Sequence, residues 1–408
     1  MKLSKLSQLI LVSFLGLSVA ALLTACSRVT IDFVYVADST AKGGSGQIES
    51  FAMDQSSGAL RTITSAVAIG DSTPVAMAIT SDYYHLYAAT QGTNKITHFT
   101  IASSGSLTKA DSVTVSGVPV SMAISEDNKY LYVVSSISSS STASAGVYLW
   151  QYPLSSGTIG TGTSTKLTLS TKNSSYGTDT LVPTGVATLV SNTAVFVTFY
   201  DKSAYNPTGT TTSSANPGWI ASIPVSSGTL GTPAYYEAGV MPTAVVADPT
   251  YRFVYVTDFV NNQLIGYTIT SGYVLNSMLD NPFTAGSEPT AITIDPRGKF
   301  IYVANYEDNS VSGYTIDSST GIPTLSVSSS GSSANATDSE PVAVAVDPAL
   351  GRFVVTANKL GNSLSGFKMD STSGALEQSQ GTPYVTGYQP TAIALAPHGN
   401  HSTQTVTQ

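Results

Sequence analysis

The sequence predicts an all-β fold, a seven-bladed β-propeller with four-stranded blades, from two strand motifs that each recur seven times. The first motif is an alternating apolar strand that begins with proline, as in PTAITID at Pro289. Its seven copies start at Pro74, Pro119, Pro183, Pro242, Pro289, Pro341 and Pro390. The second motif resembles IYVAN, and its copies start at Val34, Leu86, Leu131, Val195, Val254, Ile301 and Val354. Repeated units of this size that cannot bury an apolar face alone must pack against one another.

The two series are out of phase at the ends of the chain. The second motif opens the domain at Val34 with no first motif before it, and a first motif over Pro390 to Ala396 closes the domain with nothing after it. An open row of blades would leave unpaired strand edges. We therefore expect the terminal strands to pair and to complete one blade from both ends of the chain.

Each unit also carries two further strands. After IYVAN come SVSGYTID (310–317), a turn that ends at Gly321, and a fourth strand near Pro323 to Val327. Glycine at the turn supplies the positive φ that a tight hairpin requires. Two loops depart from the repeat, a serine-rich insertion over Ser135 to Gly146 and a longer one over Tyr200 to Gly218.

The composition of the chain excludes some kinds of partner and site. Hydrophobic residues make up 42% of the 408 residues, which is enough for a sizeable core, and the formal net charge is −8. This charge argues against nucleic acid as a partner, because phosphate binding needs a basic surface. Cys26 is the only cysteine, so the domain that follows it has no disulfide and no cysteine metal site. We expect a monomer.

The N-terminus reads as an export signal. Lys2 and Lys5 precede an apolar stretch over Leu9 to Leu23, and the segment ends in Leu-Thr-Ala-Cys at Cys26. These four residues resemble the lipobox of bacterial lipoproteins. The resemblance implies cleavage before Cys26, lipidation of its thiol, and anchoring at the outer membrane or cell surface, with the membrane as a partner. The alternative is a transmembrane anchor, for which the apolar run is short.

These observations give four expected segments. They are a lipoprotein signal peptide over residues 1–25, a lipidated linker over 26–33, the propeller over 34–397, and a disordered polar tail over 398–408.

The segment PTAITIDPRGKFIYVANYEDNSVSGYTIDSSTGIPT, from Pro289 to Thr324, and its six weaker copies resemble the lactonase-like family of seven-bladed propellers with YVTN-type repeats. That family includes 6-phosphogluconolactonase and the carboxymuconate-lactonising enzyme. The resemblance covers most of the chain and implies a propeller that hydrolyses a lactone. Where the enzymes of the family carry His or Arg, however, this chain has Thr184, Thr243 and Thr290, and Asn305 is followed by Tyr306 rather than by Glu. We therefore assign no catalytic residue.

Loops that follow second strands and precede first strands should meet at one mouth of the central channel, where ligand sites form. The candidate ligand-binding residues there are Asp38, Tyr200, Asp201, Asp258, Glu288, Asn305, Tyr306, Glu307, Asp308, Glu340 and Asn358. Their acidic and aromatic character suits a polyol, a sugar or a cation such as calcium, and no other cofactor is expected. Asn and Asp at strand ends also commonly bond to nearby backbone in turns, which is the alternative for each of them.

Three functions remain open. The first is a cell-envelope lipoprotein that binds a protein, a glycan or a small ligand at its loop-rich mouth. The second is a lactone hydrolase with an altered site, and the third is a metal-dependent enzyme that acts on a sugar lactone or a quinone. We favour the first because the residues of the expected site do not match the chemistry of the family. His85 and His98 fall outside the mouth and are expected to be packing or surface residues.

Overall fold

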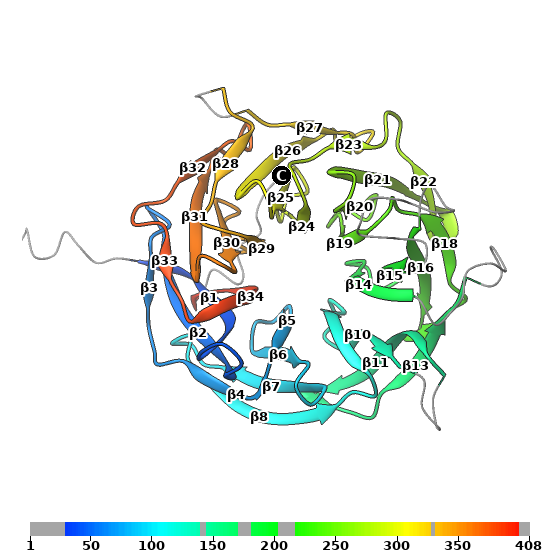
Figure 1. Ribbon diagram of the computed structural model, residues 1–408, viewed down its shortest axis with the longest axis horizontal. Coiled ribbons are helices and arrows are strands. Elements are labelled where there is room, and N and C mark those ends of the chain that lie inside the picture. The colour runs from blue at the N-terminus through cyan, green and yellow to red at the C-terminus, as the bar shows by residue number, and fades with distance from the viewer. Residues whose placement is uncertain (1–28, 139–143, 170–180, 203–216, 328–330, 400–408) are drawn as a thin grey trace, which may run out of the picture.

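The structure is a computed structural model that describes residues 29–138, 144–169, 181–202, 217–327 and 331–399. Seven antiparallel sheets stand around a central opening, as Figure 1 shows, and the predicted seven-bladed propeller is confirmed. The innermost strands are β5 (Pro74–Ile79), β9 (Val118–Ile124), β14 (Leu181–Thr188), β19 (Pro242–Ala247), β24 (Pro289–Ile294), β29 (Pro341–Val346) and β34 (Tyr388–Pro397).

The second strand of each blade carries the IYVAN-type motif. These strands are β1 (Thr30–Ser39), β6 (His85–Thr90), β10 (Tyr130–Ile137), β15 (Ala194–Asp201), β20 (Phe253–Asp258), β25 (Phe300–Asn305) and β30 (Phe353–Asn358). They are the most buried strands, because each lies in the middle of its blade between two neighbouring blades. The tyrosines Tyr35, Tyr87, Tyr255 and Tyr302 are fully buried there.

The third strands are β2 (Ser45–Asp54), β7 (Lys95–Ile101), β11 (Gly146–Ser155), β16 (Gly218–Ser226), β21 (Gln263–Thr270), β26 (Ser310–Ile316) and β31 (Ser363–Met369). One outer strand, β8 (Leu107–Thr114), is continuous. The others form in two pieces: β3 (Leu60–Thr62) and β4 (Val67–Ser72), β12 (Thr158–Ile159) and β13 (Thr163–Leu167), β17 (Thr229–Leu230) and β18 (Ala234–Glu237), β22 (Val274–Ser277) and β23 (Phe283–Thr284), β27 (Pro323–Leu325) and β28 (Ala334–Ala336), and β32 (Leu376–Gln378) and β33 (Tyr384–Val385).

Blades are numbered here from the one that both chain ends build. The first blade consists of β34 and β1–β4, the second of β5–β8, the third of β9–β13, the fourth of β14–β18, the fifth of β19–β23, the sixth of β24–β28 and the seventh of β29–β33. Besides the strands, Ser271–Tyr273 forms a short 3-10 turn between β21 and β22. In the described part of the chain, no helix is long and apolar enough to cross a membrane.

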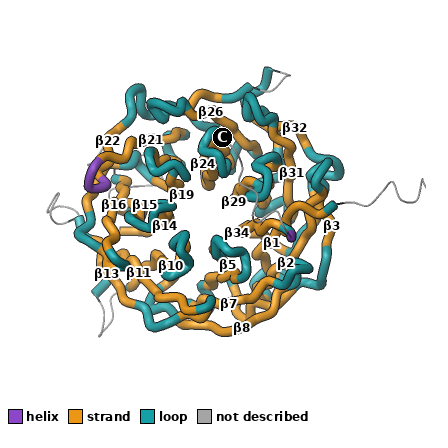
Figure 2. The backbone as a smooth tube through the Cα atoms, turned by 180° about the vertical axis from the view of Figure 1, so that it is seen from behind, coloured by secondary structure: helices purple, strands orange, loops and turns teal. Residues whose placement is uncertain are grey.

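The ring closes through the two ends of the chain, as the phase of the repeats predicted. β1 pairs antiparallel with β34, so that Val36 lies opposite Ile393 and Phe33 lies opposite Ala396. Figure 2 shows the same pair from behind, with β34 on the inside of the first blade. β1 begins at Thr30, so residues 30–33 of the expected linker belong to the sheet. Cys26 and the signal segment lie outside the described residues.

Candidate functional site

The mouth of the channel is built by a repeated backbone turn. The residue before the proline of an innermost strand has a left-handed backbone at Thr73, Glu288, Glu340 and Gln389, with φ between 50° and 57°. Left-handed backbone is uncommon for residues other than glycine, and it persists only where the surroundings fix it. Because the turn recurs in four blades, it belongs to the fold, and it sets which side chains face the mouth.

An asparagine of the neighbouring blade fixes three of these turns, those at Glu288, Glu340 and Gln389. Asn262 accepts the backbone N–H of Glu288 on its Oδ1 at 2.8 Å, and Tyr306 donates its N–H to the Glu288 carbonyl at 2.9 Å. Asn309 holds Glu340 in the same way at 2.8 Å, and the N–H of Lys359 donates to the Glu340 carbonyl at 2.7 Å. The backbone N–H and the backbone carbonyl of each glutamate are therefore both hydrogen-bonded, so the backbone that carries each side chain is fixed.

Tyr306 lies among these acids. Partial burial, followed by a hydrogen bond to the Glu340 side chain and the nearby charges of Glu340, Glu288 and Glu307, raises the pKa of Tyr306 to about 12. Burial and, after it, the charge of Glu307 raise the pKa of Glu288 above its ordinary value. The tyrosine therefore stays neutral and remains a hydrogen-bond donor at any physiological pH.

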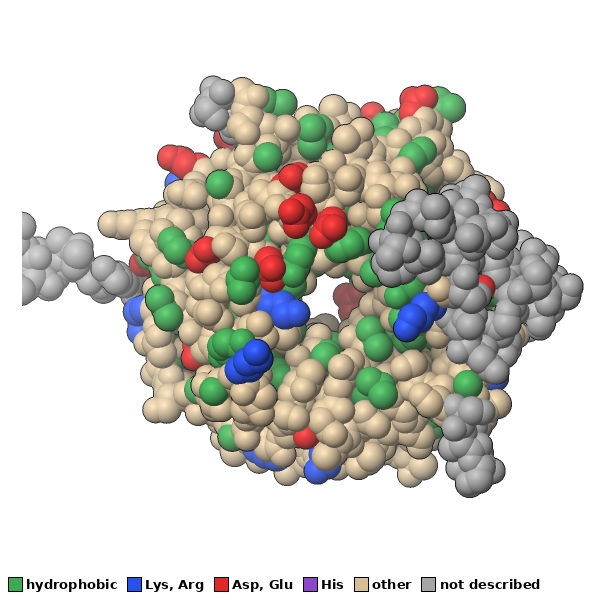
Figure 3. Space-filling model, viewed as in Figure 1, with side chains coloured by type: hydrophobic (Ala, Val, Ile, Leu, Met, Phe, Trp, Pro, Cys, Tyr) green, Lys and Arg blue, Asp and Glu red, His purple; other side chains and the backbone are tan. Residues whose placement is uncertain are grey.

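We call Glu288, Tyr306, Glu307, Glu340 and Lys359 the acidic sector of the mouth. In Figure 3, acidic side chains gather at the rim of the central opening, over the part of the ring that β24–β26 occupy, with a basic side chain beside the opening. Within the sector Glu307 is exposed, whereas the other four side chains are half-buried. The sector offers carboxylate acceptors and a phenolic donor at one surface, which suits a ligand rich in hydroxyl groups.

The remaining acid of this loop has a structural role. Asp308 is exposed, but its Oδ2 accepts the backbone N–H of Ser287 at 2.6 Å. It thereby fixes the loop that leads to Glu288. The structure thus brings four of the predicted site residues together, namely Glu288, Tyr306, Glu307 and Glu340, and it places Asp308 immediately behind them.

Another group of predicted site residues lies beneath the mouth. Asp258, Asn305 and Asn358 end their second strands, Asp38 is the last residue but one of β1, and all four are fully buried. Asp258 is the clearest case. It accepts the N–H groups of Val240 and Met241 at 3.1 and 2.9 Å, and the side-chain amides of Asn261 and Gln263 at 2.9 Å each. Its carboxylate therefore ties the loop before β19 to its own blade.

Asn305 and Asn358 hold the third strand of their blades. The amide of Asn305 donates to Ser310 Oγ at 3.0 Å and to Ser312 Oγ at 2.9 Å. The amide of Asn358 donates in the same way to Ser363 and Ser365, at 3.1 and 2.9 Å. For these two residues the alternative weighed from the sequence, local hydrogen bonding at strand ends, describes the contacts that the structure contains.

Asp38 differs from Asp258 at the equivalent position. The N–H of Gly387 donates to its Oδ2 at 3.1 Å, while its Oδ1 is buried without a hydrogen-bond partner among the described residues. Burial and then the charge of Glu49 raise the pKa of Asp38 to about 7, against hydrogen bonds from Gln47 and Gly387 that lower it. Burial likewise raises the pKa of Glu49. This carboxyl pair lies at the seam between the first and seventh blades.

Tyr200 and Asp201 end β15 in the fourth blade. Asp201 is buried and Tyr200 is half-buried, and Lys202 after them is exposed. Most of the long insertion that was expected beside them, residues 203–216, lies outside the described part of the chain. These two residues and the acidic sector belong to different blades, since β15 lies two blades from β25 around the ring.

Threonines take up the positions where the family resemblance would place His or Arg. The hydroxyl of Thr243 donates to the Pro289 carbonyl of the next blade at 2.6 Å, and the hydroxyl of Thr290 donates to the Pro341 carbonyl at 2.9 Å. Thr184 bonds instead to Thr198 at 2.9 Å within its own blade. These side chains join strands at the channel wall and bring no positive charge to it.

The arginines that might have supplied this charge lie elsewhere. Arg297 pairs with Asp295 at 2.7 Å, and Arg252 lies 3.8 Å from Asp248, both in turns between first and second strands. These turns are at the opposite end of the strands from Glu288 and Tyr306. Among the described residues, no three His, Asp or Glu side chains come together as metal ligands, so calcium at the mouth stays a prediction.

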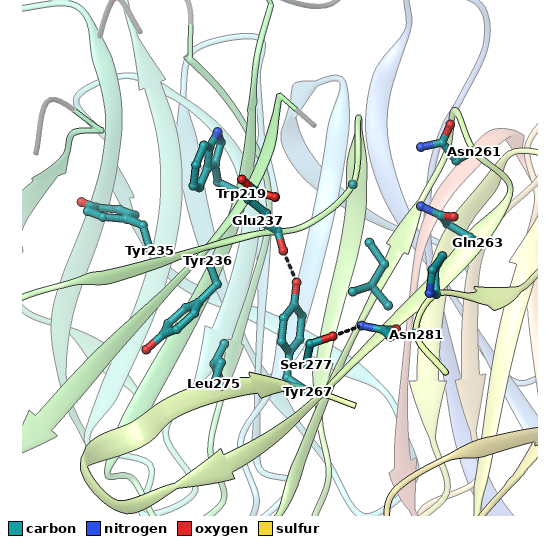
Figure 4. A pocket seen from close by; sticks show the side chains of 13 residues that line it. Trp219, Tyr235, Tyr236, Glu237, Asn261, Gln263, Tyr267, Leu275, Ser277 and Asn281 are labelled. Atoms are coloured by element: carbon teal, nitrogen blue, oxygen red, sulfur yellow. Dashed lines mark hydrogen bonds between the residues drawn. The ribbon is translucent and has the colours of Figure 1, made fainter. Parts of the chain in front are cut away.

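A second hollow lies away from the channel, between the fourth and fifth blades. Figure 4 shows this groove, which has a volume of about 830 Å³. Aromatic rings of Trp219, Tyr235, Tyr236 and Tyr267 line it together with polar side chains. The Tyr267 hydroxyl bonds to the Glu237 carbonyl, and Asn281 donates to Ser277 at 2.9 Å. Trp219, Tyr235 and Tyr267 are themselves buried, so the rings contribute mainly to packing between the two blades.

Comparison with known proteins identifies the family. The model of the lactonase family, described as a seven-bladed β-propeller, matches residues 33–143 and 226–332, which together exceed half of the chain. The chain belongs to this lactonase family. No curated protein sequence matches this lactonase-family propeller.

Several solved structures share the fold of this lactonase-family chain. A periplasmic gluconolactonase of Pseudomonas aeruginosa is 16% identical, with a TM-score of 0.70 over 91% of this chain and 100% of its own. A Bacteroides fragilis protein, provisionally assigned as a 6-phosphogluconolactonase, is 14% identical, with a TM-score of 0.69 over 90% of this chain and 98% of its own. A protein from Bacteroides uniformis with the same provisional assignment is 15% identical, with a TM-score of 0.66 over 90% of this chain and 100% of its own. At such low identity these likenesses carry the fold alone.

Proposed function

We propose that this lactonase-family propeller is an exported, lipid-anchored binding protein that takes a neutral polyhydroxy ligand, such as a sugar lactone or a sugar, at the acidic sector of its mouth. The observation that carries the proposal is the pair of clamped acids, Glu288 and Glu340, whose backbone N–H groups are held at 2.8 Å by asparagine side chains, with Tyr306 bonded through its N–H to the Glu288 carbonyl. A phenol donor between two carboxylate acceptors can bond to vicinal hydroxyl groups, which donate and accept at once.

The charge of the sector supports a neutral ligand. Glu288, Glu307 and Glu340 outnumber Lys359, and the threonines of the channel wall are neutral. A phosphate group would meet repulsion from these acids and would find no bidentate arginine. A hydroxyl-rich ligand avoids both problems, because its hydroxyls can donate to carboxylates without carrying charge.

Export and anchoring are supported by the N-terminal residues. The basic, apolar leader that ends in Leu-Thr-Ala-Cys at Cys26 is the feature of a lipoprotein signal. The likeness to a periplasmic gluconolactonase of Pseudomonas aeruginosa agrees with a location outside the cytoplasm. The acyl chains on Cys26 would supply the membrane affinity, since the acidic domain gains none from anionic lipid.

A second candidate function is hydrolysis of the same neutral lactone. Lys359 supports it, because the hydrogen bond from its backbone N–H to the backbone carbonyl of Glu340, at 2.7 Å, makes it the basic residue next to this acid in the mouth. One carboxylate could take a proton from water while the ammonium group stabilises the developing oxyanion. Both candidate functions use the same site, and they differ in whether the bound lactone is hydrolysed.

Calorimetric titration of the full chain in detergent with glucono-δ-lactone and with sorbitol tests the proposal. We expect binding of the lactone in the millimolar range or tighter, and a loss of about tenfold in Glu340→Gln and in Tyr306→Phe. The matched control is Glu377→Gln, an exposed acid on the outer strand β32, which should bind as the wild type does. Equal affinity in all four proteins would place the ligand elsewhere and overturn the proposal.

A further inference from the structure

The second blade contains a row of three titratable side chains outside the mouth. His85 on β6 and His98 on β7 face each other, with Nδ1 of His85 2.9 Å from Nε2 of His98. The other ring nitrogen of His98, Nδ1, lies 2.5 Å from Oδ1 of Asp111 on β8. His98 is buried, whereas Asp111 and His85 are partly exposed. The row therefore runs from one partly exposed group to another through a buried imidazole.

Comparison with the sister blades shows that the fold does not require these residues. The position of His85 is Phe33 in the first blade, Phe253 in the fifth and Phe300 in the sixth. The position of His98 is Gly266, Gly313 or Gly366 in the last three blades. A phenylalanine and a glycine are sufficient for packing at these sites. The second blade has replaced both with imidazoles and has placed an acid beside them.

The row also crosses the seam to the third blade. Gly157, in the hairpin of the third blade, lies against the His85 ring so closely that a Cβ there would come within 2.3 Å of Nδ1. Tyr87 stacks on His98 with ring centroids 4.9 Å apart and donates its hydroxyl to the Gly157 carbonyl at 2.6 Å. Ile159 donates its N–H to Oδ2 of Asp111 at 3.4 Å. Movement of either imidazole would thus disturb this hairpin.

The spacing of the two rings fixes how many protons the row can hold. At 2.9 Å, the two facing nitrogens share one proton, which one donates and the other accepts. Asp111 accepts the N–H of His98, which leaves Nε2 of His98 to bond with His85. If both imidazoles become cationic, two N–H groups point at each other and the bond between the rings is lost.

We propose that Asp111, His98 and His85 form an acid-sensitive switch at the seam between the second and third blades, closed near neutral pH and opened when both imidazoles are protonated. The hairpin over Ser155 to Thr158 is the element that moves. Because the proposed export exposes the protein to the pH of its surroundings, the switch would loosen this seam in an acidic medium. The inference itself depends only on the row and on the seam, and not on the function of the mouth.

The surroundings of His85 determine whether the switch opens at low or at high pH. Burial and then the neighbouring His98 lower the pKa of His85 below its ordinary value of 6.5, against the charges of Asp82 and Asp111, which raise it. Besides these groups Tyr87 faces the row, and the hairpin over Ser155 to Thr158 contributes no ionisable side chain. Because the unfolded chain binds this proton more readily than the folded one, stability is complete above about pH 6.5 and falls as the pH drops below it.

Hydrogen–deuterium exchange of the full chain at pH 7.5 and pH 5.5, corrected for intrinsic rates, tests the switch. We expect protection of the segment 155–160 to fall about tenfold at the lower pH in the wild type, while the sixth blade keeps its protection. His85→Phe, which installs the residue of the sister blades, should remove this pH response. Asp111→Asn should weaken protection at both values.

Two results would overturn the proposal. In the first, His85→Phe and wild type show the same pH response in segment 155–160. In the second, Zn²⁺ at pH 7.5 raises the unfolding temperature of the wild type but not of His98→Gln, which would assign the two imidazoles to a metal instead. An unchanged unfolding temperature with Zn²⁺ supports the switch.

Discussion

The hydroxyl of Tyr302, on the second strand of the sixth blade, donates to the carbonyl of Gly374 in the hairpin of the seventh blade at 2.8 Å. The same bond joins Tyr35 to Gly105, Tyr87 to Gly157 and Tyr255 to Gly321, at 3.0, 2.6 and 2.6 Å. A buried tyrosine therefore connects each of four blades to the next one. Because the tyrosine ring fills the core and its hydroxyl reaches the next blade, one residue serves both packing and the seam.

Tyr302→Phe should lower the free energy of unfolding by about 1–2 kcal/mol, since the ring stays but a buried carbonyl loses its donor. The control is Tyr84→Phe, whose side chain is 64% exposed and should change stability by less than about 0.5 kcal/mol. Urea unfolding followed by far-UV circular dichroism measures both. Equal stability of the two variants would show that the seam does not depend on this hydrogen bond.

Ring closure should depend on β34. Deleting residues 388–408 removes the innermost strand of the first blade and exposes the edge of β1, so the truncated chain should aggregate or lose its cooperative unfolding. Deleting residues 400–408 leaves β34 intact and should have little effect on the midpoint. Light scattering and thermal unfolding distinguish the two. Equal behaviour of both truncations contradicts closure through the chain ends.

Asp38 should make stability fall with rising pH. Its folded pKa of about 7 lies above its ordinary value of 3.8, so the folded chain holds the proton more tightly than the unfolded chain between these values. The stabilisation is complete below about pH 4 and is lost as the pH rises through 7. Relative to wild type, Asp38→Asn should therefore gain on the order of 4 kcal/mol between pH 4 and pH 7.5. Parallel pH profiles of the two proteins would contradict the burial argument for Asp38.

The pH dependence of stability expected from Asp38 is opposite to that expected from His85. Acid strengthens the seam at Asp38 and weakens the seam at His85, so global stability alone cannot separate the two effects. The variants Asp38→Asn and His85→Phe each remove one of them. For this reason the switch at His85 is followed by local exchange, whereas Asp38 is followed by global unfolding.

Cys26 should anchor the protein. Cys26→Ser removes the thiol to which lipid would be attached, so the variant should lose its acyl chains and either leave the membrane fraction or retain its leader. Fractionation and intact-mass analysis of both proteins measure this. If the serine variant is processed normally and remains in the membrane fraction, the anchor lies elsewhere in the chain.

The architecture could be predicted from the sequence because each blade repeats the same strands. The proline at the start of the innermost strand and the tyrosine of the next strand recur with a spacing that only a ring of blades satisfies. The phase shift between Val34 and Pro390 also predicted the closing pair, β1 and β34. The N-terminal boundary was less clear, since Thr30 to Phe33 read as linker although they lie in β1.

The site was predicted only in part. Asp258, Asn305 and Asn358 were candidates because they end second strands, although all three are buried and bond within their own blades. A signal was present: the equivalent positions are Thr90 and Ser135 in the second and third blades, and small neutral residues suit buried bonding better than ligand contact. The side-chain direction at a strand end depends on the turn that follows, which periodicity does not reveal.

The imidazole row was not predicted at all. His85 and His98 lie 13 residues apart and Asp111 a further 13, so only the register of β6, β7 and β8 brings them together. The departure of His85 from phenylalanine and of His98 from glycine in the sister blades was the available signal. Residues that differ from the repeat at such positions are not required by the fold and are therefore candidates for another role.

A hydrolysis assay on the full chain with neutral and phosphorylated glucono-δ-lactone, with and without calcium, tests the central claim that the mouth serves a neutral ligand. We predict little or no turnover of the phosphorylated lactone, because Thr243 and Thr290 stand where cationic side chains would be needed and the acidic sector repels both the phosphate and the oxyanion. Turnover of the neutral lactone that is lost in Glu340→Gln would move hydrolysis ahead of binding at the same site. Turnover of the phosphorylated lactone well above background, lost on substitution of a mouth residue, would contradict the account.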